Sequence, residues 1–187
     1  MNRIHHWLCR SNSWQRKLQD NLIPWALRDV ELGDDVLELG PGPGLTTNIL
    51  RHRFSNLTSI EIDPELEASL RSRTSGTNIE VVTGNAAAMP FRDNSFSGVV
   101  SFTMLHHVPS TQQQDQLFRE AYRVLKPQAS FVATDSRRSW SMRLLHIGDT
   151  MVIIDPDTIQ ARMEKAGFRD VFVEWTSDVL RFHGHRH

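Results

Sequence analysis

Cysteine is almost absent from this sequence, since Cys9 is its single cysteine among 187 residues. One thiol cannot form a disulfide within the chain, and it cannot supply the paired cysteines of a Cys-x-x-Cys metal or redox motif. The chemistry of the protein therefore has to come from other residue types. A reducing, cytoplasmic location is the simplest expectation.

Long apolar runs and an excess of one charge are also missing. No stretch approaches the roughly 20 apolar residues that cross a bilayer, and the start, MNRIHHWLCRSNSW, carries arginine and histidine where a secretory signal would be apolar. We therefore expect neither a membrane span nor export. The 21 basic and 22 acidic residues give a net charge of −1, so there is no general attraction to nucleic acid.

Short apolar runs alternate with amphipathic stretches from Gly33 onwards, which is typical of a parallel α/β sheet. The final two runs lie close enough to form an antiparallel hairpin. We predict a Rossmann-like, doubly wound α/β fold with a mostly parallel seven-stranded sheet, N-terminal helices and a C-terminal hairpin. The expected strands are residues 36–39, 57–62, 79–83, 98–105, 130–135, 171–175 and 179–182, and the expected helices are residues 45–52, 64–73, 112–125 and 156–166.

Three glycines follow the first predicted strand in the motif ELGPGPG. In a doubly wound sheet, ligands bind beyond the carboxyl ends of the strands, and glycine lets the backbone approach a ligand at positive φ. A dinucleotide site needs Gly-x-Gly-x-x-Gly, but Gly44 comes one residue early, and Pro41 and Pro43 remove two amide donors. The turn therefore suits a neutral or zwitterionic ligand better than a pyrophosphate. A merely tight strand–helix connection is the alternative.

Glu61 lies near the end of the second predicted strand. At this position of a doubly wound sheet, an acidic side chain can accept hydrogen bonds from both hydroxyls of a ribose. A solvated acid at a strand end is the alternative. Its position and its spacing from the glycine turn agree with the ribose role.

Four ordered motifs resemble those of class I S-adenosylmethionine-dependent methyltransferases, in particular the small-molecule, methyltransferase type 11-like branch. They are ELGPGPG, Glu61, GNAAAMPF after the third predicted strand and FSGVVSFTMLHHV at the fourth, and VLKP before the fifth extends the likeness. Together they cover about residues 30–135 and are specific for cofactor and fold, but not for substrate. The resemblance implies in-line transfer of a methyl group from S-adenosylmethionine to a small-molecule acceptor, with S-adenosylhomocysteine as product.

The resemblance also implies roles for individual residues. Glu38 and the glycines would surround the methionine part of the cofactor, and Glu61 and Ile62 would bind ribose and adenine. Asn85 stands where the family often has aspartate, and its amide oxygen can still accept a bond from the adenine amino group. Residues 101–105 would line the floor beside the methyl group. The implied cofactor-binding set is Glu38, Gly40, Pro41, Gly42, Gly44, Glu61, Ile62, Asn85, Ala86, Ser101 and Thr103.

One domain is predicted for residues 1–187, because no linker divides the chain. Within it we expect an N-terminal helical cap, a cofactor-binding core, a substrate-cap segment with several arginines, and a C-terminal helix with its hairpin. A solvated surface is the alternative for those arginines. The four parts are residues 1–30, 31–135, 136–155 and 156–187.

Two histidines, His106 and His107, follow the fourth predicted strand. Methyl transfer requires alignment of the reactants, exclusion of water and, where the nucleophile carries a proton, a base. A neutral imidazole can act as that base, and His106 is the preferred candidate. The alternative is that either histidine closes its loop by bonding to backbone.

Other functions are also weighed. A nicotinamide-dependent oxidoreductase shares the general fold, but the glycine spacing and the prolines argue against it. A cofactor-binding protein without catalysis is a third hypothesis. Nucleic-acid methylation is disfavoured, because the fourth strand is not followed by Asn-Pro-Pro-Tyr and has no cysteine nearby, although the basic N-terminus keeps RNA open. The tail RFHGHRH has three histidines without a carboxylate or cysteine, so we expect no metal site.

Overall fold

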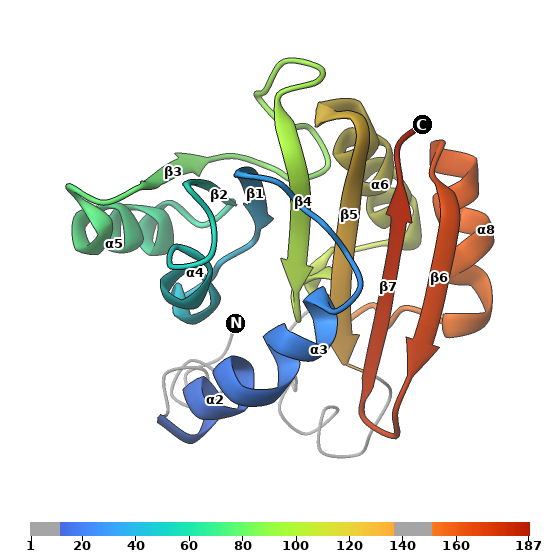
Figure 1. Cartoon of the computed structure of the whole chain (residues 1–187), viewed down its shortest axis with the longest axis horizontal. Helices are drawn as coiled ribbons and strands as arrows, with labels where there is room; N and C mark the ends of the chain where they lie inside the picture. The colour runs from blue at the N-terminus through green and yellow to red at the C-terminus, as the bar shows by residue number, and fades with distance from the viewer. Residues whose placement is uncertain (1–11, 137–150) are drawn as a thin grey trace.

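The structure, a computed structural model, describes residues 12–136 and 151–187 (Figure 1). Most of the predicted substrate-cap segment, residues 136–155, lies outside these ranges, and its role stays a prediction. Residues 1–11, which form most of the basic N-terminal stretch, also lie outside them. The remaining chain contains the whole predicted core and the C-terminal hairpin.

A seven-stranded sheet forms the centre of the described structure, in the order β3-β2-β1-β4-β5-β7-β6. The first five strands along the chain pair in parallel, β7 is antiparallel to β5, and β6 is antiparallel to β7. The chain order reverses between β1 and β4, as in a doubly wound sheet, which confirms the predicted fold class. The strands are β1 Asp35–Leu39, β2 Asn56–Glu61, β3 Ile79–Thr83, β4 Phe96–Phe102, β5 Leu125–Ser136, β6 Arg169–Trp175 and β7 Val179–His185.

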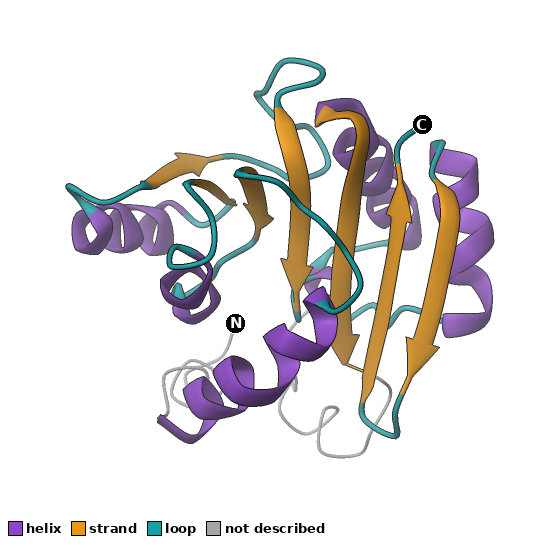
Figure 2. Cartoon of the chain, viewed as in Figure 1, coloured by secondary structure: helices purple, strands orange, loops and turns teal. Residues whose placement is uncertain are grey.

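Helices cover both faces of the sheet, with α3 on one face and α6 and α8 on the other (Figures 1 and 2). Asp63, Ser110 and Asp155 accept hydrogen bonds from the first-turn amides of α5, α6 and α8, which fixes where these helices begin. No helix in the described ranges has the length and apolar character needed to span a bilayer. The helices are α2 Asn12–Lys17, η1 Leu18–Leu22, α3 Ile23–Leu27, α4 Leu45–Leu50, α5 Pro64–Thr74, η2 Leu105–His107, α6 Thr111–Val124 and α8 Pro156–Ala166.

Two apolar layers hold the sheet between these helices. The first joins α6 and α8 to the sheet through phenylalanines, among them Phe118, Phe131 and Phe182. It also contains Leu117, Ala121 and Val124 of α6, whose helical spacing in the sequence predicts one apolar face, and all three are fully buried. The second joins the N-terminal helices to the other face through Ile23 and Val100.

Several strand boundaries differ from the sequence-based prediction, and the largest differences lie in β4, β5 and β7. The strand predicted at residues 98–105 is β4, which ends at Phe102, because Thr103 takes a left-handed backbone conformation with φ of 52°. Leu125 leaves the predicted helix, since it pairs with Phe96 ahead of a register shift in the β4–β5 ladder. The histidine tail extends β7 as far as His185.

Arg181 ties the C-terminal hairpin to the N-terminal helices. Its side chain is buried, at 1% exposure, and it donates from Nε to the Ala26 carbonyl at 2.9 Å and from Nη2 to the Arg28 carbonyl at 2.6 Å. Nη1 donates to Glu174 Oε1 at 2.7 Å. Because the last carbonyls of a helix have no partner within the helix, this cation satisfies the end of α3.

Replacing Arg181 is expected to destabilise the fold. Arg181→Met keeps much of the apolar volume but leaves the two buried carbonyls unsatisfied, so the free energy of unfolding should fall by about 2–4 kcal/mol. Urea denaturation measures this change. Arg28→Gln is the matched control, because Arg28 contacts the same Glu174 from a half-exposed position; its loss should stay below about 1 kcal/mol. Equal losses in both variants would contradict a special role for Arg181.

His183 makes stability depend on pH. Burial, reinforced by Arg181 and His185, lowers the pKa of His183 to about 4. The unfolded chain therefore binds more protons than the folded chain between pH 6.5 and pH 4, and stability is lost as the pH falls through this window. Because the ring is only half-buried, we expect a loss of about 1 kcal/mol at pH 5 relative to pH 7.

The His183 contribution is measured by urea denaturation at both pH values. His183→Gln removes the titrating group, so the variant should lose less stability than the wild type on acidification. The same pH dependence in both proteins would assign the effect to other groups.

Candidate functional site

A turn with three glycines lies at the carboxyl end of β1 and leads into α4. Gly40, Gly42 and Gly44 have φ values of 61°, 54° and 83°, so all three adopt the positive φ expected of them. The turn is fixed from two sides, because Gly40 N donates to the Ile60 carbonyl at 2.9 Å and Gly44 N to the Pro41 carbonyl at 2.9 Å. A Cβ atom added to Gly42 would meet no atom within 4 Å. The turn thus leaves open space above its middle glycine.

Glu38 lies buried beneath this turn and binds three hydroxyl groups. Thr46 donates to Oε1, while Thr47 and Ser59 donate to Oε2 at 2.6 and 2.8 Å. Burial raises the pKa of the Glu38 carboxyl, although the three hydroxyls act in the opposite direction. The carboxylate therefore connects β1 to the first turn of α4 and to β2. This geometry gives Glu38 a role in positioning the glycine turn.

Glu61 is brought directly against the glycine turn, although the two are separated by a helix and a strand in the sequence. It ends β2 and is buried, and its Oε2 accepts a hydrogen bond from Gly42 N at 2.9 Å. Oε1 accepts one from Asp63 N at 3.0 Å. The next residue, Ile62, is 67% exposed. A carboxylate, open glycine backbone and an exposed apolar side chain therefore meet at this edge of the sheet.

Asn85 and Ala86 form a turn after β3. The Asn85 side chain closes this turn, because its Oδ1 accepts a hydrogen bond from Ala87 N at 2.8 Å. Asn85 is exposed. Its amide oxygen has a second lone pair, so one further hydrogen bond can be accepted from a ligand.

Two charged residues of α6 hold the segment that follows Asn85. Arg123 donates to the carbonyls of Phe91 and Met89 at 2.7 and 3.1 Å, and Glu120 accepts from Met89 N at 2.7 Å. The Arg123 guanidinium lowers the pKa of the Glu120 carboxyl, which keeps the pair charged. The turn at Asn85 is therefore anchored to a rigid helix.

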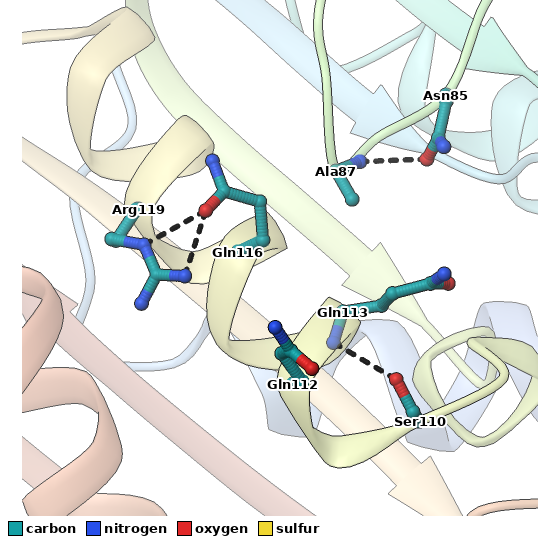
Figure 3. Close-up of a pocket in the computed structure, with 7 residues that line it drawn as sticks. All are labelled: Asn85, Ala87, Ser110, Gln112, Gln113, Gln116 and Arg119. Atoms are coloured by element: carbon teal, nitrogen blue, oxygen red, sulfur yellow. Dashed lines mark hydrogen bonds between the residues drawn. The ribbon is translucent and has the colours of Figure 1, made fainter.

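A hollow of about 390 Å³ separates this turn from the first half of α6 (Figure 3). Gln116 Oε1 accepts hydrogen bonds from Arg119 Nε and Nη2 at 2.9 and 2.7 Å. The lining residues offer carboxamide, hydroxyl and guanidinium groups but no carboxylate, so the hollow suits a polar ligand group. They are Asn85, Ala87, Ser110, Gln112, Gln113, Gln116 and Arg119.

The chain after β4 turns sharply towards the glycines. Ser101 is fully buried within β4, and its Oγ has no hydrogen-bond partner among the described residues. Thr103 N donates to the Thr134 carbonyl at 2.8 Å, which holds the left-handed backbone of this β-branched residue. The Met104 side chain then packs so closely on Gly40 that a Cβ there would lie 2.3 Å from Met104 Cγ.

His106 and His107 lie in the short helix η2, with ring centroids 4.2 Å apart. His106 is 2% exposed and Asp135, the penultimate residue of β5, is fully buried. His106 Nδ1 lies 2.5 Å from Asp135 Oδ1, and His106 N donates to Asp135 Oδ2 at 2.9 Å. The carboxylate thus binds both the ring and the backbone of the preferred candidate base.

The sequence analysis missed Asp135, which belongs to this site, and Gln114, which supports it from outside. Gln114 is buried in α6 and donates from Nε2 to the carbonyls of Leu105 and Val152, which supports η2. An acidic residue at the end of the apolar run SFVATD was an available signal for Asp135, since Glu61 was recognised in the same way.

The histidine tail does not join this site. His183 and His185 lie in β7 with ring centroids 6.0 Å apart, and His187 Nε2 lies 2.9 Å from Asp170 Oδ2. Within residues 12–136 and 151–187, no group of three or more histidine, cysteine or acidic side chains is arranged to hold a metal ion.

Comparison with known proteins adds independent findings. A family model described as a methyltransferase domain matches residues 37–133. The 24-methylenesterol C-methyltransferase 2 of Arabidopsis thaliana is 35% identical over 112 residues, which are 57% of this chain and 30% of that protein. The rRNA adenine N-6-methyltransferase of Saccharopolyspora erythraea is 46% identical over 70 residues, 36% of this chain and 18% of that protein.

A solved structure also has the same fold. Phosphoethanolamine N-methyltransferase 2 of Haemonchus contortus, in complex with S-adenosyl-L-methionine, aligns with a TM-score of 0.75 and 15% identity, covering 100% of this chain and 60% of that chain. The chain spans half or less of the length of the first curated relatives it matches.

Proposed function

Because the chain belongs to the methyltransferase domain family, whose model matches residues 37–133, we propose that it transfers a methyl group from S-adenosylmethionine to a small-molecule acceptor. The family match agrees with the predicted class I family. The observation that carries the proposal is the meeting of the glycine turn, Glu61 and the end of β4 where the order of the sheet reverses. A cytoplasmic location and a small-molecule acceptor are parts of the proposal.

The residues at this edge fit the proposed cofactor. The open space above Gly42 admits a ligand that lies directly on the backbone, and a buried carboxylate at Glu61 can accept hydrogen bonds from two adjacent hydroxyls. The exposed Ile62 side chain offers an apolar surface to a flat ring. When bound, S-adenosylmethionine supplies a methyl group on a sulfonium, already activated for displacement.

The proposed cofactor-binding residues divide into two groups. Residues with backbone or side-chain atoms at the open edge would contact the cofactor. Glu38 and Ser101 are buried, and they would support the site without direct contact. Glu38 would hold the glycine turn in position through its three hydroxyl partners. The proposed contact residues are Gly40, Pro41, Gly42, Gly44, Glu61, Ile62, Asn85, Ala86 and Thr103.

His106 is the proposed base for acceptors that carry a proton on the nucleophilic atom. The contact of its ring with the Asp135 carboxylate supports this role, because a base has to be held in a fixed orientation. His107 is the neighbouring alternative. The nicotinamide alternative has no support from the family match. An assay of methyl transfer separates catalysis from cofactor binding alone.

Gly42→Ala tests the cofactor site. The added methyl group meets no protein atom, so stability should fall only by the roughly 1 kcal/mol of a left-handed alanine. The methyl group would, however, occupy the space proposed for the cofactor. We expect the dissociation constant of S-adenosylhomocysteine, measured by calorimetry, to rise at least about tenfold.

Gly76→Ala is the matched control for this measurement. Gly76 has φ of 76° and the same open surroundings, but it lies outside the site. Its substitution should reproduce the loss of stability and leave binding unchanged. Unchanged binding in Gly42→Ala, or tight binding of NAD by the wild type, would contradict the proposed cofactor site.

Transfer itself is tested with methyl-labelled S-adenosylmethionine and fractionated cell extract. The wild type should label a small-molecule fraction, and His106→Gln should reduce labelling about a hundredfold or more because the base is lost. His107→Gln should retain most of the activity, and both variants should keep the affinity for S-adenosylhomocysteine. Label in RNA alone would replace the small-molecule acceptor by a nucleic acid, and full activity of His106→Gln would assign His106 to structure.

A further inference from the structure

Beyond the base itself, we propose that Asp135 is the positioning residue for His106. Its carboxylate fixes the imidazole in the tautomer that leaves Nε2 to accept the proton of the acceptor. This inference rests on the proposed function, because it concerns a proton that leaves the acceptor during methyl transfer.

The contacts of Asp135 determine the tautomer. An ionised carboxylate only accepts hydrogen bonds, and Asp135 Oδ1 lies 2.5 Å from His106 Nδ1. Nδ1 therefore has to carry the hydrogen of a neutral ring. The proton-accepting lone pair of the ring is then on Nε2.

Asp135 is itself held in place by backbone donors. His106 N donates to Oδ2 at 2.9 Å and Ser136 N donates to Oδ1 at 2.6 Å. A fully buried carboxylate needs such donors to offset the loss of hydration. Because both the ring and the backbone of His106 bind Asp135, the imidazole cannot rotate without losing a charge-assisted bond.

The surrounding chain brings these two residues together from different strands. β4 and β5 are parallel neighbours, and Phe102 is in register with Thr134. The left-handed Thr103 turns the chain out of β4, and its amide bonds the Thr134 carbonyl beside Asp135. A left-handed conformation of a β-branched residue is costly, so the fold accepts strain at the point that directs η2 onto Asp135.

In the proposed step, one bond forms at the methyl carbon, one breaks, and one proton moves to the base. The nucleophilic atom of the acceptor forms its bond to the methyl carbon as the methyl–sulfur bond breaks, with that electron pair staying on sulfur. The proton of the acceptor passes to His106 Nε2, and the Asp135 carboxylate compensates the positive charge of the resulting imidazolium. The imidazolium later returns the proton to solvent.

The first test examines the free wild-type chain. Long-range proton–nitrogen NMR spectra of a sample labelled with ¹⁵N-histidine report which ring nitrogen carries hydrogen, and His106→Gln assigns the signal. The expected state at neutral pH is protonated Nδ1 and unprotonated Nε2. A wild-type ring with hydrogen on Nε2 alone would overturn the inference, whether or not any Asp135 variant folds.

The second test is Asp135→Asn. With its NH₂ group in the place of Oδ1, the new carboxamide donates to Nδ1 and moves the ring hydrogen to Nε2. Its oxygen still accepts from the His106 amide, while the Ser136 amide loses its acceptor. We expect the NMR signature to switch and label transfer to fall about a hundredfold or more. Affinity for S-adenosylhomocysteine should stay within about twofold of the wild type, because the variant leaves the glycine turn untouched.

Gln114→Ala is the matched control. It removes the two hydrogen bonds that support η2 at Leu105 and Val152, but it leaves the Asp135–His106 pair in place. It should keep the wild-type tautomer and lose less than about tenfold of the transfer rate. A loss as large as that of Asp135→Asn would show that only the stability of η2 matters and would overturn the inference.

The two proposals fail in different ways. A wild type that transfers label to neither small molecules nor RNA overturns the proposed function, and this inference with it. Full transfer activity in a folded Asp135→Asn protein with a switched tautomer overturns the inference alone. A hundredfold loss with a switched tautomer and unchanged cofactor affinity supports it.

Discussion

The buried carboxylate of Glu38 is the constraint on which the cofactor side of the structure depends. A carboxylate removed from water has to be bonded on both oxygens, and the three hydroxyls that do so come from α4 and β2. Their positions are therefore fixed relative to β1. The glycine turn connects these fixed elements over a short distance, which forces positive φ at each of its glycines.

A second buried carboxylate organises the other side of the reversal point. Asp135 holds η2 in place as Glu38 holds α4. Asp135 lies on β5, and its donors on His106 come from the segment that follows the neighbouring strand β4. The two sides meet where Met104 packs on Gly40. The segment that leads into η2 is therefore in direct side-chain contact with the glycine turn.

The fold could be predicted largely from local patterns. Apolar runs marked all seven strands, and the apolar face of α6 was identified correctly because helical spacing depends on neighbours three and four residues away. The boundaries failed where pairing at a distance overrode local preference. The end of β4 depends on a left-handed Thr103 held by Thr134, and Leu125 leaves its helix to pair with Phe96. Neither partner is visible from the segment alone.

The site shows the same division between local and distant information. Glycine spacing and an acid at a strand end are local signals, and they led to Gly42 and Glu61, which the structure joins by a hydrogen bond. The partner of His106 is 29 residues away in sequence, and only the adjacency of β4 and β5 brings it near. Asp135 was nonetheless marked by its chemistry, since a buried acid at the end of an apolar strand requires a partner. The donors of such an acid are to be expected in the segments that follow the adjacent strands. For Asp135, the segment that follows β4 contains His106.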